Sequence, residues 1–275
     1  MPAHRPRTLL AVLGLALVLL VSGCGGKDAE KRPSGDQPSE SSSSSPGDKA
    51  APDPGYGAAK VGDCHQMSAE QSVASVDTSR KVSCRGKHTS VVAYVGYLPK
   101  PVTPASPVAQ RRKLGSRFCR PAYQRTVGGT LADRATSILT WTLFTPSQAQ
   151  LERGARWLRC DVVARSGAKL VPLPSGKPML ARGVPEQVRI CQTDAGVDIS
   201  CAKPHAFRVQ GVYQAAIKAY PDPTTYTPVA RARCRQLVGS FGGFWQPPSQ
   251  QGWAAGDRFI RCLSPMATPS STPTP

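Results

Sequence analysis

Strict alternation of apolar and polar residues marks one stretch of this chain as a half-buried β-strand. Within residues 136–144, Leu139, Trp141 and Leu143 alternate with threonines. Short runs rich in β-branched and aromatic residues predict further strands. These runs cover residues 79–84, 90–98, 156–164 and 206–213.

Helix start and stop signals accompany these strands twice. Ser106-Pro107 offers a cap followed by proline, and Gly128-Gly129 offers a stop, so we expect a helix between them with a break before Pro121. Thr227-Pro228 and Gly242-Gly243 repeat the start and stop signals. The pattern predicts an α+β fold, in which each unit has a few antiparallel strands and one packed helix.

Eight cysteines fall into two matching sets of four. The second cysteine of each set begins Cys-x-x-x-His, at 84–88 and at 201–205. The fourth closes Gly-x-Arg-x-x-Arg-Cys, at 154–160 and at 256–262. So many matched positions predict a tandem duplication, with one module over 59–165, a linker over 166–185 and a second module over 186–263.

Four cysteines in a module allow three disulfide pairings. Residues 191–201 read as a hairpin turning near Asp194-Ala-Gly196, which favours a bond between the cysteines at its two ends. By correspondence we expect the first cysteine to pair with the second and the third with the fourth, each bond stabilising the fold by ~2–4 kcal/mol. The expected pairs are Cys64–Cys84, Cys119–Cys160, Cys191–Cys201 and Cys234–Cys262.

The N-terminus predicts export. An apolar stretch from Leu9 to Val21 follows two arginines and ends in Val-Ser-Gly-Cys24, which resembles a bacterial lipobox. We expect a lipoprotein signal peptide over 1–23 and an acylated Cys24 that anchors the protein to the outer face of the cell membrane. An ordinary secretory signal is the alternative. Low apolar content predicts a disordered tether over 24–58 and a disordered tail over 264–275.

The charge balance is strongly basic, with 35 Lys and Arg against 17 Asp and Glu. A basic body outside the cell would attract anionic lipid, an anionic wall polymer or an acidic envelope protein, whereas nucleic acid is a poor candidate there. A stripe of cations on the first helix is the first place to look for such binding, although a solvated helix face explains it equally well. The stripe consists of Lys113, Arg117 and Arg120.

Other repeated residues have both structural and functional interpretations. His88 and His205 could each join a cysteine as a zinc ligand, but each of the eight cysteines has a plausible disulfide partner, so we expect each histidine to cap a turn or pack beside the disulfide. Arg156 and Arg258 are either structural or contact an anion. Motifs for serine hydrolases, nucleotide binding and CxxC redox chemistry are missing. We therefore predict no catalytic residue, no cofactor and no metal.

Several of these motifs occur together in one known family. Val-Gly-Asp-Cys at 61–64, Cys-x-x-Pro-His at 201–205 and Gly-Asp-Arg at 256–258 resemble the septum-formation-related domain of actinobacterial membrane proteins and lipoproteins. The resemblance covers residues 59–164 and 186–263. Lys87 before His88, and Val-Arg-Ile before Cys191, depart from the family pattern. The resemblance implies an envelope protein linked to division, and it implies no reaction.

Three hypotheses follow for the function. The first is a non-catalytic, lipid-anchored envelope protein that binds an anionic wall component or a protein partner through a basic surface. The second is a secreted enzyme or inhibitor that acts on wall material, and the third is a metal-binding lipoprotein. The sequence leaves open whether the two modules pack together or swing about the linker.

Overall fold

The computed structural model describes residues 51–100, 102, 106–239, 243–254 and 256–266, which belong to one compact unit beginning at Lys49. The predicted signal peptide, Cys24, and most of the predicted tether and tail lie outside these described residues. None of the helices in the described ranges is both long enough and apolar enough to cross a membrane.

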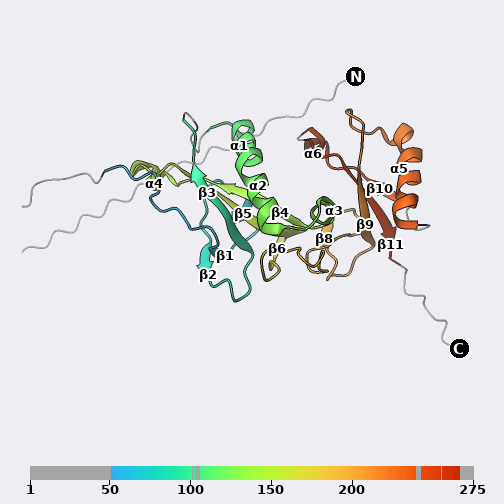
Figure 1. Cartoon of the computed structure of the whole chain (residues 1–275), viewed down its shortest axis with the longest axis horizontal. Helices are drawn as coiled ribbons and strands as arrows, with labels where there is room; N and C mark the ends of the chain where they lie inside the picture. The colour runs from blue at the N-terminus through green and yellow to red at the C-terminus, as the bar shows by residue number, and fades with distance from the viewer. Residues whose placement is uncertain (1–50, 101, 103–105, 240–242, 255, 267–275) are drawn as a thin grey trace, which may run out of the picture. The chain divides into compact units, whose positions relative to one another are not determined.

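The first module is built on an antiparallel sheet of six strands (Figure 1). The strand order is β2-β1-β3-β5-β4, and β6 pairs with the end of β5. β5 is an inner strand and is almost wholly buried, which fits its long apolar run. The strands are β1 (Cys64–Gln66), β2 (Arg80–Val82), β3 (Ser90–Tyr97), β4 (Leu139–Phe144), β5 (Trp157–Ser166) and β6 (Lys169–Val171).

The second module repeats this sheet. Its strand order, β8-β7-β9-β11-β10, matches β2-β1-β3-β5-β4 strand for strand. The counterpart of β4 is present but short, because β10 has three residues and β4 has six. The α+β class and two small modules are thus confirmed. The strands are β7 (Ile190–Gln192), β8 (Asp198–Ser200), β9 (Phe207–Gln214), β10 (Phe244–Gln246) and β11 (Phe259–Pro265).

The first module's main helix is broken, as the sequence predicts. A π-helical segment lies immediately before the turn that holds Pro121, where the proline lacks an N–H to continue the regular ladder. The helix ends at Gly128, whose φ of 68° suits glycine. The helical elements of this module are η1 (Gln71–Val73), α1 (Val108–Leu114), η2 (Gly115–Cys119), α2 (Arg120–Val127), α3 (Leu131–Ala135) and α4 (Gln148–Glu152).

The predicted start of the second module's helix is wrong. Helix α5 spans Pro223–Val238 and packs on β9, β10 and β11 (Figure 1). Asp222 caps it by accepting backbone N–H bonds through its carboxylate, so the helix begins before the expected Thr227-Pro228. It ends at Gly239, with φ 75°, before the expected glycine pair. A short α6 (Gln250–Ala254) follows.

All four expected disulfides are present. Cys64–Cys84 and Cys191–Cys201 each tie the first strand of a sheet to the turn after the second. The other two bonds tie each main helix to an inner strand of its sheet, β5 or β11. The equivalent disulfides at equivalent positions support the duplication inferred from the sequence.

The two modules share a hydrophobic core. One cluster of buried side chains joins Val91 and Leu139 of the first module to Ile190 and Leu263 of the second. Backbone hydrogen bonds also cross between the modules, for example from the Ile138 N–H to the carbonyl of Val188 at 2.8 Å. The modules therefore pack together, which answers the question that the sequence leaves open.

Three predicted boundaries need correction. The linker over 166–185 is not a loose join, because it forms β6 and buries Leu180 in the shared core. The end of the predicted tether is ordered: the Arg156 N–H bonds the Pro54 carbonyl, and the Trp157 indole bonds the Tyr56 carbonyl. β11 runs to Pro265, two residues beyond the predicted end of the module at 263, because β9 supplies it with partners throughout.

Candidate functional site

In each module, the arginine immediately before the last cysteine forms an ion pair with an aspartate. In the first module, Arg159 on β5 lies 2.6 Å from the carboxylate of Asp77. In the second, Arg261 on β11 lies 2.6 Å from the carboxylate of Asp198. The equivalence of the two strands places both arginines alike, so each sheet carries one polar cluster in the same position.

The cluster of the first module is deeply buried. Arg159 also donates two hydrogen bonds to Asp161, at 2.8 and 3.0 Å, and its guanidinium lies 4.8 Å from the ring centroid of Phe144. The Ser90 hydroxyl donates a further bond to Asp161 at 2.5 Å. One cation thus contacts two buried carboxylates, so removal of the arginine would leave both without their positive partner.

The two carboxylates beside Arg159 differ in pKa. Burial raises the pKa of Asp161, and the charge of Arg159 opposes this only in part. Burial also raises the pKa of Asp77, but hydrogen bonds from Ser79 and the charge of Arg159 outweigh it, so the net shift is downward. Asp77 is therefore the carboxylate whose ionised form the fold favours.

A histidine that the sequence reasoning missed completes this cluster. His65 on β1 places Nδ1 3.2 Å from the Ser79 hydroxyl and 3.5 Å from the carboxylate of Asp77. The equivalent residue of the second module is Gln192, which donates to Asp198 at 2.8 Å. The available signal was positional, since each of these residues directly follows the first cysteine of its set.

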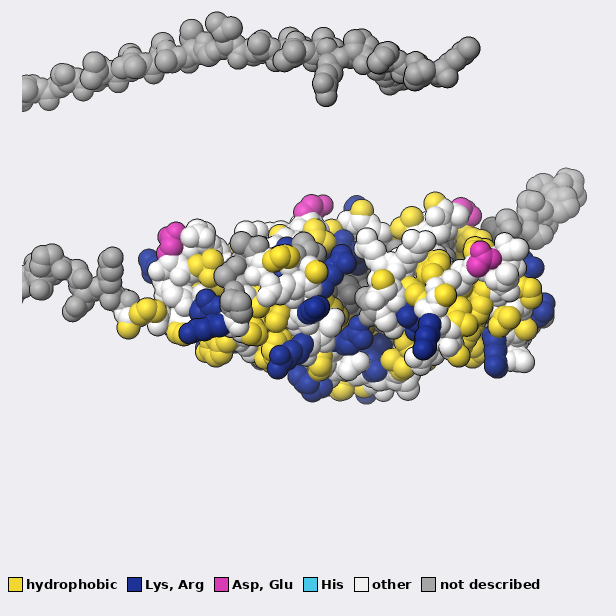
Figure 2. Space-filling model, turned by 90° about the horizontal axis from the view of Figure 1, so that it is seen from above, with side chains coloured by type: hydrophobic (Ala, Val, Ile, Leu, Met, Phe, Trp, Pro, Cys, Tyr) yellow, Lys and Arg dark blue, Asp and Glu magenta, His cyan; other side chains and the backbone are white. Residues whose placement is uncertain are grey.

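The polar cluster of the second module opens into a cleft of about 940 Å³. Both modules line this cleft, and we refer to it as the basic cleft. Figure 2 looks onto a hollow in the middle of the molecule, with Lys and Arg side chains gathered around it. The charged and aromatic lining residues are Arg120, Arg134, Arg165, Arg261, Asp198, Asp257, Tyr123, Trp141, Tyr220 and Phe259.

The arginines of the basic cleft differ in how far they are already engaged. Arg134 donates to the carbonyls of the Gly128-Gly129 pair, and Arg165 donates to the Ser72 hydroxyl at 2.5 Å. Both bonds leave the positive charge uncompensated, because the acceptors are neutral. Arg120 is exposed and has no ion-pair partner within the described ranges. The cleft therefore offers positive charge to an incoming ligand.

The three residues of the predicted cationic stripe are exposed, but they do not all line the basic cleft. Lys113, Arg117 and Arg120 all reach solvent, yet only Arg120 lines the basic cleft. The Arg117 guanidinium lies 5.2 Å from the ring centroid of Phe118. The π-helical turn between Lys113 and Arg120 departs from the α-helical periodicity on which the predicted stripe depends.

The repeated arginines, Arg156 and Arg258, donate hydrogen bonds to backbone carbonyls. Arg156 donates to the carbonyl of Val102 at 3.1 Å. Arg258 donates to the carbonyl of Trp253, and its guanidinium lies 4.3 Å from the centroid of that indole. Neither arginine lines the basic cleft. These contacts favour the structural interpretation of both residues over an anion contact.

The repeated histidines hold equivalent turns. Nδ1 of His88 lies 2.9 Å from the carbonyl of Gly86, and Nδ1 of His205 lies 2.7 Å from the carbonyl of Lys203. Because a carbonyl only accepts, each ring carries its proton on Nδ1 in this arrangement. These bonds favour the turn-capping interpretation.

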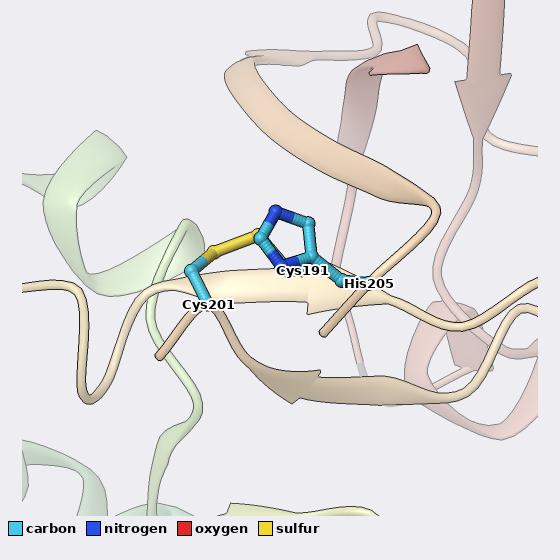
Figure 3. Close-up of side chains that lie close together, drawn as sticks. All are labelled: Cys191, Cys201 and His205. Atoms are coloured by element: carbon cyan, nitrogen blue, oxygen red, sulfur yellow. A yellow bond between two sulfur atoms is a disulfide. The ribbon is translucent and has the colours of Figure 1, made fainter. Parts of the chain in front are cut away.

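One possible metal-ligand set is found in the described part of the chain. Cys191, Cys201 and His205 bring potential ligand atoms within 4.8 Å of one another (Figure 3). The two sulfur atoms are joined in a disulfide, so they lack the thiolate charge that zinc requires. In its oxidised form this cluster offers one imidazole rather than a zinc site.

Comparison with known proteins identifies one family. The family model described as septum formation matches residues 61–262, a single match that spans both modules. No curated protein and no solved structure gives a significant match. The match covers well over half of the chain, including all eight disulfide cysteines, the polar cluster of each module and the basic cleft. The chain belongs to the septum formation family.

Proposed function

We propose that this protein is a non-catalytic, lipid-anchored component of the cell envelope that binds an anionic wall polymer in the basic cleft. Membership of the septum formation family supports a role at the division site. That family is not a known enzyme family, which favours a binding role over the alternative of a wall-acting enzyme.

The lining of the basic cleft carries this proposal. Four arginines face two aspartates there, and one of those aspartates, Asp198, is already paired with Arg261. Arginine forks match carboxylate and phosphate oxygens. The apolar faces of Tyr123, Trp141 and Phe259 suit the apolar faces of sugar rings. A polymer of sugars or polyols that carries phosphate or carboxylate groups offers both features.

The proposed location depends on two sequence features. The Val-Ser-Gly-Cys24 motif follows a stretch of signal-peptide length, and acyl chains on this cysteine would anchor the protein at the outer face of the cell membrane. The four disulfides favour an oxidising compartment, because thiols in the cytosol are kept reduced. Localisation of a fluorescent fusion tests this, with Cys24→Ala as the variant that should leave the membrane fraction.

Binding to a pair of polysaccharides tests the cleft. The full chain in detergent should bind an anionic polysaccharide and should not bind a neutral one of the same length. Arg120→Ser should weaken binding about tenfold, since it removes one charge-assisted contact. Lys113→Ser is the matched control, because Lys113 is also an exposed helix cation and lies outside the cleft. Equal loss in both variants would show nonspecific charge attraction and would contradict the proposal.

A further inference from the structure

A second pocket lies over the polar cluster of the first module, away from the basic cleft. It has a volume of about 360 Å³, and the two sets of lining residues have no member in common. Residues 57–60 and Gln150 form part of its wall. Three members of the polar cluster, His65, Asp77 and Arg159, also line it. We refer to this as the His65 pocket.

His65, which lines this pocket, has one ring nitrogen without a partner among the described residues. Its side chain is 7% exposed, and Nδ1 is engaged with Ser79 and Asp77. Nε2 is buried and has no hydrogen-bond partner among the described residues. A buried polar atom without a partner is unfavourable. A ligand atom in the pocket would supply the missing partner.

One cation of the His65 pocket is left for a ligand. Arg159 is paired with Asp77 and Asp161, and Lys81 is paired with Asp63 at 2.8 Å. Lys60 also lines the pocket, and it has no ion-pair partner in the ranges that the structure describes. The Nε2–H of His65 and the ammonium of Lys60 would then both present donors to the same space.

We infer that the His65 pocket binds a small oxyanion, a carboxylate or phosphate group, which accepts hydrogen bonds from His65 Nε2–H and from the Lys60 ammonium. When the Ser79 hydroxyl donates to Nδ1, at 3.2 Å, the ring proton lies on Nε2, which is the donor that this contact requires. The site is separate from the proposed function, which concerns the basic cleft.

The second module lacks the free donor at the equivalent position. Gln192 occupies the position equivalent to His65, but its amide already donates to Asp198 at 2.8 Å and to Gln246 at 2.5 Å. Its two N–H donors are therefore used within the protein. The substitution of glutamine for histidine at this position removes the free donor and leaves the polar cluster intact.

Nitrogen NMR of the histidine side chains tests this inference directly. The chain has four histidines, so an imidazole spectrum of the full chain in detergent has few resonances to assign. Inorganic phosphate and acetate are added separately at constant ionic strength, and glucose serves as the neutral probe. At least one of the two anions should shift the His65 nitrogens in a saturable way, with His88 and His205 unmoved, and glucose should have no effect.

Two variants make the outcome specific. His65→Gln installs the residue that the second module uses at this position, so the fold should persist, and calorimetry should show that binding of the anion is lost. Lys60→Gln should weaken it about tenfold. Arg120→Ser should leave it unchanged, which separates this site from the basic cleft. No saturable shift of His65, an equal shift with glucose, or unchanged binding in His65→Gln would overturn the inference.

Discussion

Arg159 and Asp77 are 82 positions apart in the chain, yet Nη2 of the arginine lies 2.6 Å from Oδ2 of the aspartate, with both side chains at most 7% exposed. This pair joins the loop before β2 to β5. The equivalent pair in the second module, Arg261 and Asp198, is far more exposed, at 25% and 36%. The same pairing therefore has a different energetic weight in each module.

Replacing Arg159 should be much more damaging than replacing Arg261. Arg159→Met leaves two carboxylates buried without a cation, and we expect it to lower the free energy of unfolding by about 3–5 kcal/mol. Arg261→Met is the matched control and should cost at most about 1 kcal/mol, as exposed pairs do. Urea unfolding of both variants measures the difference. Similar losses would mean that burial does not set the strength of this pair.

Asp77 should make the protein sensitive to acid. Its pKa is lower in the folded protein than its ordinary value of about 4, so ionisation of Asp77 stabilises the fold. This contribution is fully present above the ordinary pKa and is lost as pH falls through the pKa in the folded protein. Asp161 has a raised pKa and acts in the opposite sense. Asp77→Asn should flatten the acid limb of a plot of unfolding free energy against pH, and an unchanged limb would contradict this.

A side chain at position 115 should destabilise the folded protein. A Cβ at this helical position would come closer to the Trp141 ring than real Cβ atoms do. Gly115→Ala should therefore lower the free energy of unfolding by about 1–3 kcal/mol, through displacement of the indole. Gly86→Ala is the control, because its nearest neighbour would be the Ser83 carbonyl at 3.8 Å. Tryptophan fluorescence reports whether the Trp141 environment changes only in the first variant.

The disulfides should differ in what they contribute. Cys119 and Cys160 are 41 positions apart, whereas Cys191 and Cys201 are 10 apart. Because a longer closed loop restricts the unfolded chain more, replacing the first pair with alanines should cost about 1 kcal/mol more than replacing the second. Thermal or urea unfolding of the two double variants measures this. A larger loss for the short loop would indicate that native packing, rather than chain entropy, dominates.

The sequence predicted local features well because their signals are local. The alternation at Leu139, Trp141 and Leu143 is sufficient to place β4, and the hairpin between Cys191 and Cys201 is sufficient to pair them. The helix start failed for the opposite reason. Thr227-Pro228 looks like a start, but Asp222 and Pro223 give one earlier, and local sequence does not rank two adjacent signals.

The polar cluster and both pockets could not be predicted, because their members are distant in the chain. Asp77, Arg159 and His65 come from a loop and two strands that only the sheet brings together. The basic cleft needs two modules packed on one another, and composition is silent about that packing. The segment over 166–185 has the prolines and glycines that are typical of a linker, but its Leu180 is buried in the shared core, which the sequence pattern does not indicate.

The shared core has a consequence for cleavage of this protein between its two modules. A chain cut between the modules would expose Val188 and Ile190 on one piece and Leu139 and Val162 on the other, all now buried together. We therefore expect the two modules to unfold together, although each has its own sheet and its own pair of disulfides.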